Sequence, residues 1–201
     1  MEFSPTQIRI LESYLKLCQK ESPSNVTLQK VADHAKLAFG TVRYNFAEDE
    51  MDLTTAGLLY AVTRGQRFIE TYLKEAEKKK SYNGLAEYIL GTFEWIREEP
   101  SHASFLFYFY YLTTTSYKLP FSNEDFITTA RRRVQTLLYE CIGRGLYKPV
   151  GNVEALSIQI HTLVVGAGLV VATTKSEAQR NKLFETTFRA IESLILAARA
   201  D

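Results

Sequence analysis

Apolar residues recur along the chain at spacings of three and four, the period of an α-helix with one buried face. The clearest helix start lies at Ser4, where Pro5 takes the first helical position and Gln7 follows three residues after the serine. Serine, proline and glutamine in these positions cap and begin a helix. The apolar face of this first helix then comprises Ile8, Leu11, Leu15 and Cys18, and Tyr14 and Leu17 widen it.

The same period predicts nine helices in all and no strand. Two short helices follow the first, one capped by Thr27 and ending near Lys36, the other running from about Ala38 to Phe46. A long helix is expected from about Met51 to Lys80. We therefore expect an all-α fold, with a three-helix head at residues 1–50 and a helical body at 51–201. The remaining helices are expected at 84–98, 101–116, 123–143, 153–173 and 176–200.

The two short helices between residues 27 and 46 are joined by a tight turn, which is the arrangement of a helix-turn-helix. In such a motif the second helix lies in the major groove of DNA. The helical period assigns an inner set of side chains, namely Val31, Ala32, Ala35, Leu37, Val42 and Phe46. It assigns an outer set to Phe39, Gly40, Thr41, Arg43, Tyr44 and Asn45.

These residues resemble the helix-turn-helix of the TetR family of transcriptional regulators. The matching segments are Val31-Ala32, then Gly40-Thr41-Val42-Arg43-Tyr44-Asn45-Phe46, then Glu50 and Leu53. The motif covers about the first 53 residues, and beyond it the helix pattern and the chain length agree with the family. The resemblance implies a one-component regulator, most often a repressor, that binds a palindromic double-stranded DNA operator.

The resemblance also implies roles for single residues of the head. Thr27, Thr41 and Tyr44 correspond to phosphate contacts, which set the register of the protein on DNA. Phe39 and Arg43 are the candidates for base contacts, since phenylalanine can touch a thymine methyl group and arginine can bond guanine twice. Three further candidates for DNA contact complete the set, namely Lys36, Gly40 and Asn45.

Several residues of the head depart from the family pattern. Lys36 stands where the turn usually has glycine, so either the lysine adopts a left-handed conformation or the turn differs. Ala38 replaces the usual serine cap, and Ala47-Glu48-Asp49 replaces the usual lysines. Residues 1–50 hold six basic and seven acidic residues, a net charge of −1. The alternative of a helical ligand-binding or interaction protein that has lost DNA binding therefore stays open.

The body contains an aromatic cluster that could serve either as plain core or as the wall of an apolar cavity. Within seven positions, 105 to 111, six residues are Phe or Tyr. Small-molecule pockets combine such apolar walls with a few polar anchors, and the resembled family encloses an effector in its body. The candidate effector-binding residues are Trp95, Phe105, Tyr108, Phe109, Tyr139 and His161.

The last two helices, about 153–200, carry apolar stripes with small residues. The resemblance implies that they pair with a second copy as a four-helix homodimer interface, although they could instead be simple core. Effector binding would favour a dimer geometry that no longer fits the operator, with the helix at 51–80 as the mechanical link.

Composition and motifs limit the classes of protein to which this chain could belong. The net charge is +1 and 46% of residues are apolar, which fits a globular chain. We find no metal motif, no cofactor motif and no catalytic motif, so we expect no cofactor and no enzymatic activity. The two cysteines are expected to be reduced thiols. The longest apolar run, 163–172, is too short to span a membrane and no signal peptide is evident, so a cytoplasmic protein is expected.

Overall fold

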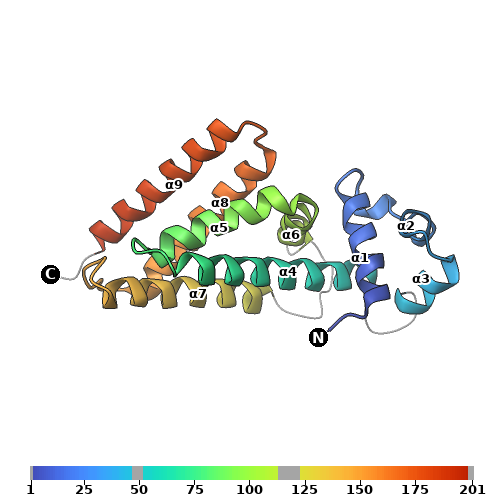
Figure 1. Cartoon of the computed structure of the whole chain (residues 1–201), viewed down its shortest axis with the longest axis horizontal. Coiled ribbons are helices and arrows are strands. Elements are labelled where there is room, and N and C mark those ends of the chain that lie inside the picture. Colours follow the sequence, from blue (N-terminus) through green and yellow to red (C-terminus); the bar gives the residue numbers. More distant parts are fainter. Residues whose placement is uncertain (1, 47–51, 113–122, 199–201) are drawn as a thin grey trace. The chain divides into compact units, whose positions relative to one another are not determined.

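The computed structural model describes residues 2–46, 52–112 and 123–198, and within these ranges the chain is helical without any β-strand. This confirms the predicted all-α fold. The predicted helix ends at 113–116 and 199–200, and the acidic residues 48–50, lie outside the described ranges. The elements (Figure 1) are α1 (Pro5–Cys18), the short 3-10 helix η1 (Pro23–Asn25), α2 (Leu28–Ala35), α3 (Phe39–Phe46), α4 (Leu53–Ala76), α5 (Gly84–Glu98), α6 (Pro100–Leu112), α7 (Asn123–Gly143), α8 (Val153–Thr173) and α9 (Glu177–Ala197).

The chain forms two compact units. Unit 1 comprises Met1–Gln66 and Glu99–Pro120, and unit 2 comprises Arg67–Glu98 and Phe121–Asp201. The helix α4 begins in unit 1 and ends in unit 2. Unit 1 therefore holds α6 in addition to the three short helices of the head.

The start of α1 has the predicted reciprocal cap. The Gln7 N–H donates to Ser4 Oγ over 3.2 Å, and the Ser4 N–H donates to Gln7 Oε1 over 2.9 Å. Leu11, Tyr14 and Leu15 are buried as predicted, whereas Ile8 is exposed. The fully buried Ile10 takes the place of Ile8, because the packed face of α1 is centred on the pairs 10–11 and 14–15.

Unit 1 is closed around Gly57 in α4. A Cβ atom at this glycine would lie 3.2 Å from ring atoms of both Tyr14 in α1 and Phe105 in α6. These two rings meet edge to face with their centroids 5.4 Å apart, an arrangement that aromatic pairs favour. The Tyr14 hydroxyl also bonds Thr54 Oγ1 over 3.0 Å. One small residue thus lets three helices approach closely.

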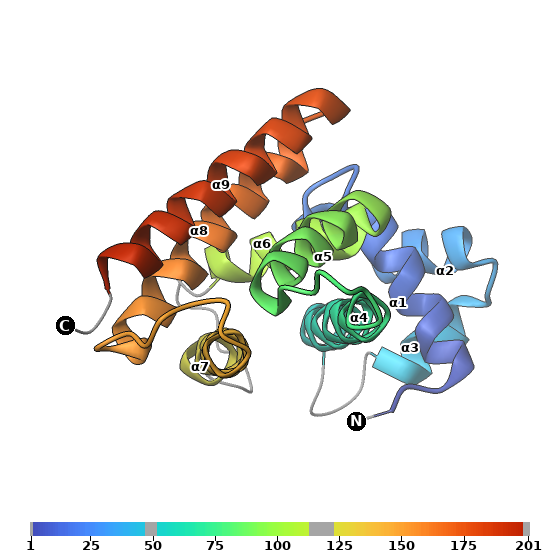
Figure 2. The same ribbon diagram turned by 60° about the vertical axis from the view of Figure 1, so that its left-hand side comes forward.

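Unit 2 is built around α5, which packs against α7, α8 and α9. The helices α8 and α9 lie side by side as an antiparallel pair (Figure 2). Each begins with a side-chain cap, in which Asn152 accepts from the Ala155 N–H and Ser176 accepts from the Gln179 N–H. In the α4 segment of this unit, Tyr72 lies so close to α5 that a Cβ at Gly91 would be 2.9 Å from its ring.

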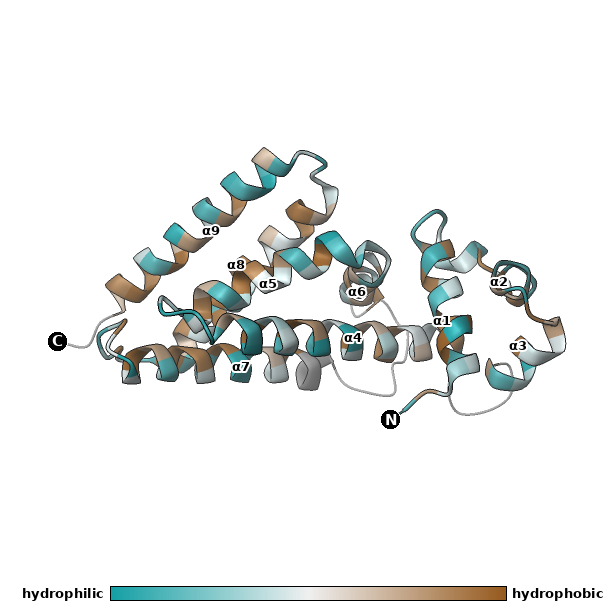
Figure 3. Cartoon of the chain, in the orientation of Figure 1, coloured by the Kyte–Doolittle hydropathy of each residue, from teal (hydrophilic) through white to brown (hydrophobic). Residues whose placement is uncertain are grey.

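The most continuously apolar helix of the described chain is α8 (Figure 3). Its length and mean hydropathy are sufficient to cross a membrane, which the shorter run considered in the sequence did not indicate. Packed core helices have the same composition, and α8 packs against three neighbours in unit 2. Its apolar character is therefore accounted for in part by this packing.

Candidate nucleic-acid interface and effector-binding residues

The helices α2 and α3 form the predicted helix-turn-helix. Thr27 caps α2 by accepting a hydrogen bond from the Lys30 N–H over 3.3 Å. Of the predicted inner set, Leu37 is half-buried and the others are buried. The packing between the two helices therefore follows the helical period of the sequence. The buried members are Val31, Ala32, Ala35, Val42 and Phe46.

The turn between them contains a left-handed lysine. Lys36 has φ 52° and ψ 49°, and among the described residues it is the only non-glycine with a positive φ. The Leu37 N–H donates to Ala32 O over 3.0 Å, which is how a helix closes on a left-handed residue. Of the two alternatives that the sequence left open, the turn keeps its usual geometry and the lysine accepts the strain.

The helix α3 directs its outer set away from the packed face. Tyr44 is 85% exposed and Phe39 is 42% exposed. Gly40 and Arg43 are also exposed, and open space surrounds the position of a Cβ at Gly40. The exposed part of these aromatic side chains is available for contact with another molecule.

Two further candidates, Thr41 and Asn45, are half-buried and bonded to each other. Asn45 Nδ2 donates to the backbone oxygen of Thr41 over 2.8 Å. At the start of α3, Ala38 O accepts a backbone hydrogen bond from the Thr41 N–H at 2.9 Å. An alanine offers no side-chain oxygen for this cap, so the first turn of α3 depends on its packing.

Three acidic residues of the head are held by neighbours. Glu21 pairs with Lys30 over 2.8 Å, Asp33 accepts from Gln29 over 2.8 Å, and Glu12 accepts from the Tyr60 hydroxyl over 2.7 Å. Each negative charge is thus directed toward a partner inside unit 1. These contacts fix the direction of the three carboxylates and leave the net charge of −1 over residues 1–50 unchanged, because the cation Lys30 is already counted in it.

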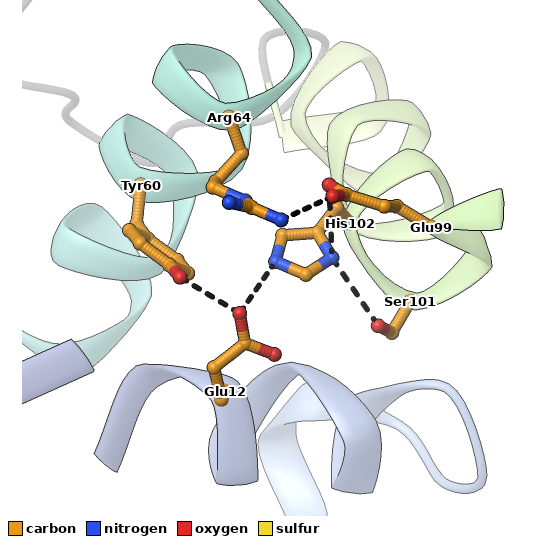
Figure 4. Close-up of polar contacts among 6 residues, drawn as sticks. All are labelled: Glu12, Tyr60, Arg64, Glu99, Ser101 and His102. Atoms are coloured by element: carbon orange, nitrogen blue, oxygen red, sulfur yellow. Dashed lines mark hydrogen bonds and ion pairs between the residues drawn. The ribbon is translucent and has the colours of Figure 1, made fainter. Parts of the chain in front are cut away.

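Unit 1 also contains a polar cluster that the sequence did not reveal (Figure 4). His102 in α6 is buried, and its Nε2 lies 3.2 Å from Glu12 Oε1 in α1, without the alignment of a full hydrogen bond. Its Nδ1 lies 3.8 Å from Glu99, which also pairs with Arg64 of α4. Contact with His102 and the bond from Tyr60, opposed by burial, lower the pKa of Glu12 to about 2. The cluster therefore joins α1, α4 and α6.

Three of the predicted effector-binding residues lie in unit 1. Phe105 and Tyr108 line a cavity of about 180 Å³ between the end of α1 and the start of α6, whereas Phe109 is fully buried core. Cavities for drug-sized ligands usually measure about 300–1,000 Å³. This cavity therefore suits a molecule smaller than the effector envisaged from the aromatic cluster. Its other lining residues are Cys18, Gln19, Glu21, Ser22, Pro23, Ser101 and Ser104.

The other three lie in unit 2. Trp95 on α5 and His161 on α8 are buried, whereas Tyr139 on α7 is 61% exposed. Burial, and secondarily the charge of Arg131, lower the pKa of His161 to about 4. The six predicted residues thus divide between the two units, and Tyr139 points to the surface of its own unit. Their role in binding stays a prediction.

No group of three or more His, Cys, Asp and Glu side chains in the described ranges could hold a metal ion. Cys18 is half-buried and Cys141 is buried. Burial raises the pKa of both thiols, for Cys18 to about 12, which keeps them protonated. The described thiols therefore have the environment of packed side chains.

Comparison by sequence finds no matching protein-family model and no matching curated protein. Comparison by structure finds many solved structures that match this chain. A protein from Pseudomonas aeruginosa PAO1, assigned as a transcriptional regulator, aligns with 98% of this chain over 94% of its own, with TM-score 0.74 and 12% identity. A TetR transcription regulator from Haloarcula marismortui aligns with 98% of this chain over 99% of its own, with TM-score 0.71 and 17% identity.

SmeT, solved in complex with triclosan, aligns with 98% of this chain over 93% of its own, with TM-score 0.63 and 14% identity. The fold is thus of the class shared by helical regulators with a helix-turn-helix head. More specifically, it is the TetR fold, as the resemblance in the head predicted. At these identities the likeness concerns the fold.

Proposed function

We propose that this chain is a cytoplasmic transcriptional regulator that binds a palindromic DNA operator as a homodimer and leaves it when a small apolar or aromatic effector binds. The observation that carries the proposal is the outer face of α3, where Phe39, Arg43 and Tyr44 are exposed on a helix whose other face is packed. A helix presented in this way fits the major groove.

In this proposal the head makes two kinds of DNA contact. Thr27, Thr41 and Tyr44 bind phosphate groups, and Phe39 and Arg43 bind base edges. The exposed Lys36 adds positive charge beside α3, and the open space at Gly40 admits a close approach of the backbone. Glu12, Glu21 and Asp33 are each held by a partner within unit 1. The alternative is a head that has lost DNA binding.

Selection of bound fragments from the source genome tests the proposal, with wild type and Tyr44→Ala side by side. We expect wild type to enrich one palindromic site and Tyr44→Ala to lose that enrichment, because a phosphate contact is gone. Tyr111→Ala is the matched control, since Tyr111 is also an exposed tyrosine but lies on α6. The proposal fails if folded wild-type protein enriches no site at low salt.

A further inference from the structure

Arg131 on α7 differs from two other arginines of unit 2, Arg133 and Arg144. Arg133 Nη2 lies 2.8 Å from Glu70, and Arg144 Nη2 lies 3.0 Å from Glu77. Arg131 has neither an ion pair nor a hydrogen bond within the part of the chain that the structure describes, and its Nε atom is inaccessible to water. The Arg131 residue as a whole is of intermediate exposure.

The position of Arg131 on α7 explains why its Nε atom is shielded from water. Val134 and Leu138, three and seven residues further on, are fully buried, so Arg131 shares the inward face of the helix. A guanidinium has five N–H donors and keeps its charge at any physiological pH. An N–H group that is shielded from water and has no acceptor is costly, so proteins normally provide one.

A second incomplete polar group lies on the neighbouring helix. His161 of α8 is 7% exposed, and its Nδ1 atom has no hydrogen-bond partner within the described residues. The charge of Arg131 acts on His161 across the packed helices α7 and α8. The same burial and charge lower the pKa of His161, so the imidazole is neutral near pH 7 and adds no second positive charge.

We propose that Arg131 and His161 form the anion-binding end of the effector site, and that the effector is an apolar molecule with a single carboxylate. This inference rests on the proposed function and names the class of its effector. A guanidinium pairs with a carboxylate through two parallel hydrogen bonds, and a neutral imidazole can donate a third. One positive charge balances one negative charge, so a phosphate dianion would remain uncompensated.

The surroundings fit the apolar part of such a molecule. The helix α5 packs against both α7 and α8, and it contributes the buried aromatic side chains of Phe93 and Trp95 to unit 2. Ile160 and Val164, next to His161 on α8, are buried as well. An effector anchored by its carboxylate would therefore extend into an aromatic and aliphatic interior.

Titration calorimetry on the full chain without DNA tests the proposal. The probes are two acids, dodecanoate and 3-phenylpropanoate, and their alcohols, dodecan-1-ol and 3-phenylpropan-1-ol. We expect wild type to bind at least one acid at least tenfold more tightly than its alcohol. Arg131→Gln should lose that preference, and Arg133→Gln, which removes an ion-paired arginine two residues away, should keep it.

Three results would overturn the inference: neither acid binds, acid and alcohol bind equally, or Arg131→Gln binds the acid as wild type does. Arg131→Met guards against a folding defect, since it fills similar space without the shielded N–H that lacks an acceptor, and its denaturation midpoint without ligand should be no lower than that of wild type. Operator binding is measured separately. If the protein binds an acid but no operator, the proposed function is contradicted and this inference is not. If it binds an operator but neither acid, this inference is contradicted and the proposed function is not.

Discussion

The turn between α2 and α3 requires a left-handed backbone, and the chain places a lysine there. For a residue with a Cβ atom this conformation costs about 1–2 kcal/mol relative to the right-handed one, whereas glycine adopts it freely. Lys36 nevertheless keeps the turn in the form that packs α2 on α3. The strain is therefore borne by one residue, and the interior of the head is undisturbed.

We expect Lys36→Gly to raise the free energy of unfolding by up to about 1 kcal/mol, because glycine relieves the strain but gains freedom in the unfolded chain. Urea denaturation of both proteins measures the change. Lys36→Ala is the control, since it removes the charge and keeps the Cβ atom. A stabilisation of equal size in Lys36→Ala would show that charge and not backbone strain is responsible.

His161 should make stability depend on pH in a defined window. Its folded pKa of about 4 lies below its ordinary value of 6.5. Between these values the unfolded chain takes up a proton that the folded chain excludes, so stability falls as pH falls from about 6.5 to about 4. Burial and Arg131 are the causes of the shift.

At pH 5 the resulting loss in unfolding free energy, relative to neutral pH, amounts to roughly 2 kcal/mol. We expect His161→Gln to remove it, so that the difference in unfolding free energy between pH 7 and pH 5 is smaller in the variant than in wild type. Denaturation with urea at both pH values gives the measurement. Identical pH dependence in the two proteins would show that His161 is accessible to protons in the folded state.

Among the elements, those with strong local signals were predicted best. The bounds of α5, α7 and α8 agree with the sequence expectation, because Gly84, Asn123 and Asn152 stand at their starts and proline or glycine follows each end of the first two. The lysine run 78–80 was wrongly included in α4, which ends at Ala76. Charged residues occur equally well at a helix end and in the loop that follows it, so the sequence did not show where α4 ends.

The candidate sites were predicted less completely, since their partners lie on different helices. The helical period identified the outer face of α3, which depends on one helix alone. It did not show that Glu12 and His102 meet, or that the charge of Arg131 reaches His161, because such relations depend on how helices pack. For the same reason, the aromatic residues expected around one effector divide between two units.

The approach of α4 to α5 in unit 2 depends on Gly91. A Cβ atom there would lie 2.9 Å from Cδ1 and 3.1 Å from Cγ of Tyr72, so the ring or the helix must move. We expect Gly91→Ala to lower the free energy of unfolding by roughly 1–2 kcal/mol, since overpacking outweighs the gain in helix propensity. Thermal denaturation measures this.

Gly143→Ala is the matched control for that experiment. This glycine ends α7, and nothing lies within 4 Å of the position of its Cβ. The control should be no less stable than wild type. If Gly91→Ala were equally harmless, the contact between Tyr72 and α5 would be looser than the distances indicate.

For the whole molecule, the proposed homodimer places the exposed apolar side chains of α8 and α9 between two copies. Leu169 is 52% exposed, and Ile158, Val170 and Leu196 are exposed with it. We expect Leu169→Glu to convert a dimer to a monomer, because a carboxylate at such an interface loses its hydration. Size-exclusion chromatography with light scattering measures the mass.

Leu146→Glu serves as the control, since Leu146 is exposed to a similar degree but precedes α8. It should leave the mass unchanged. A monomeric wild type at micromolar concentration, or a dimer that persists in Leu169→Glu, would contradict the proposed interface.

The burial of the single tryptophan has a practical consequence for the two units. Trp95 is the only tryptophan in the chain, and it lies in the interior of unit 2. Fluorescence excited selectively in tryptophan therefore reports on unit 2 alone, whereas far-ultraviolet circular dichroism reports on the helices of both units. Coincident transitions would indicate that the two units unfold together. An earlier loss of helical signal would mean that unit 1 opens while unit 2 is still folded.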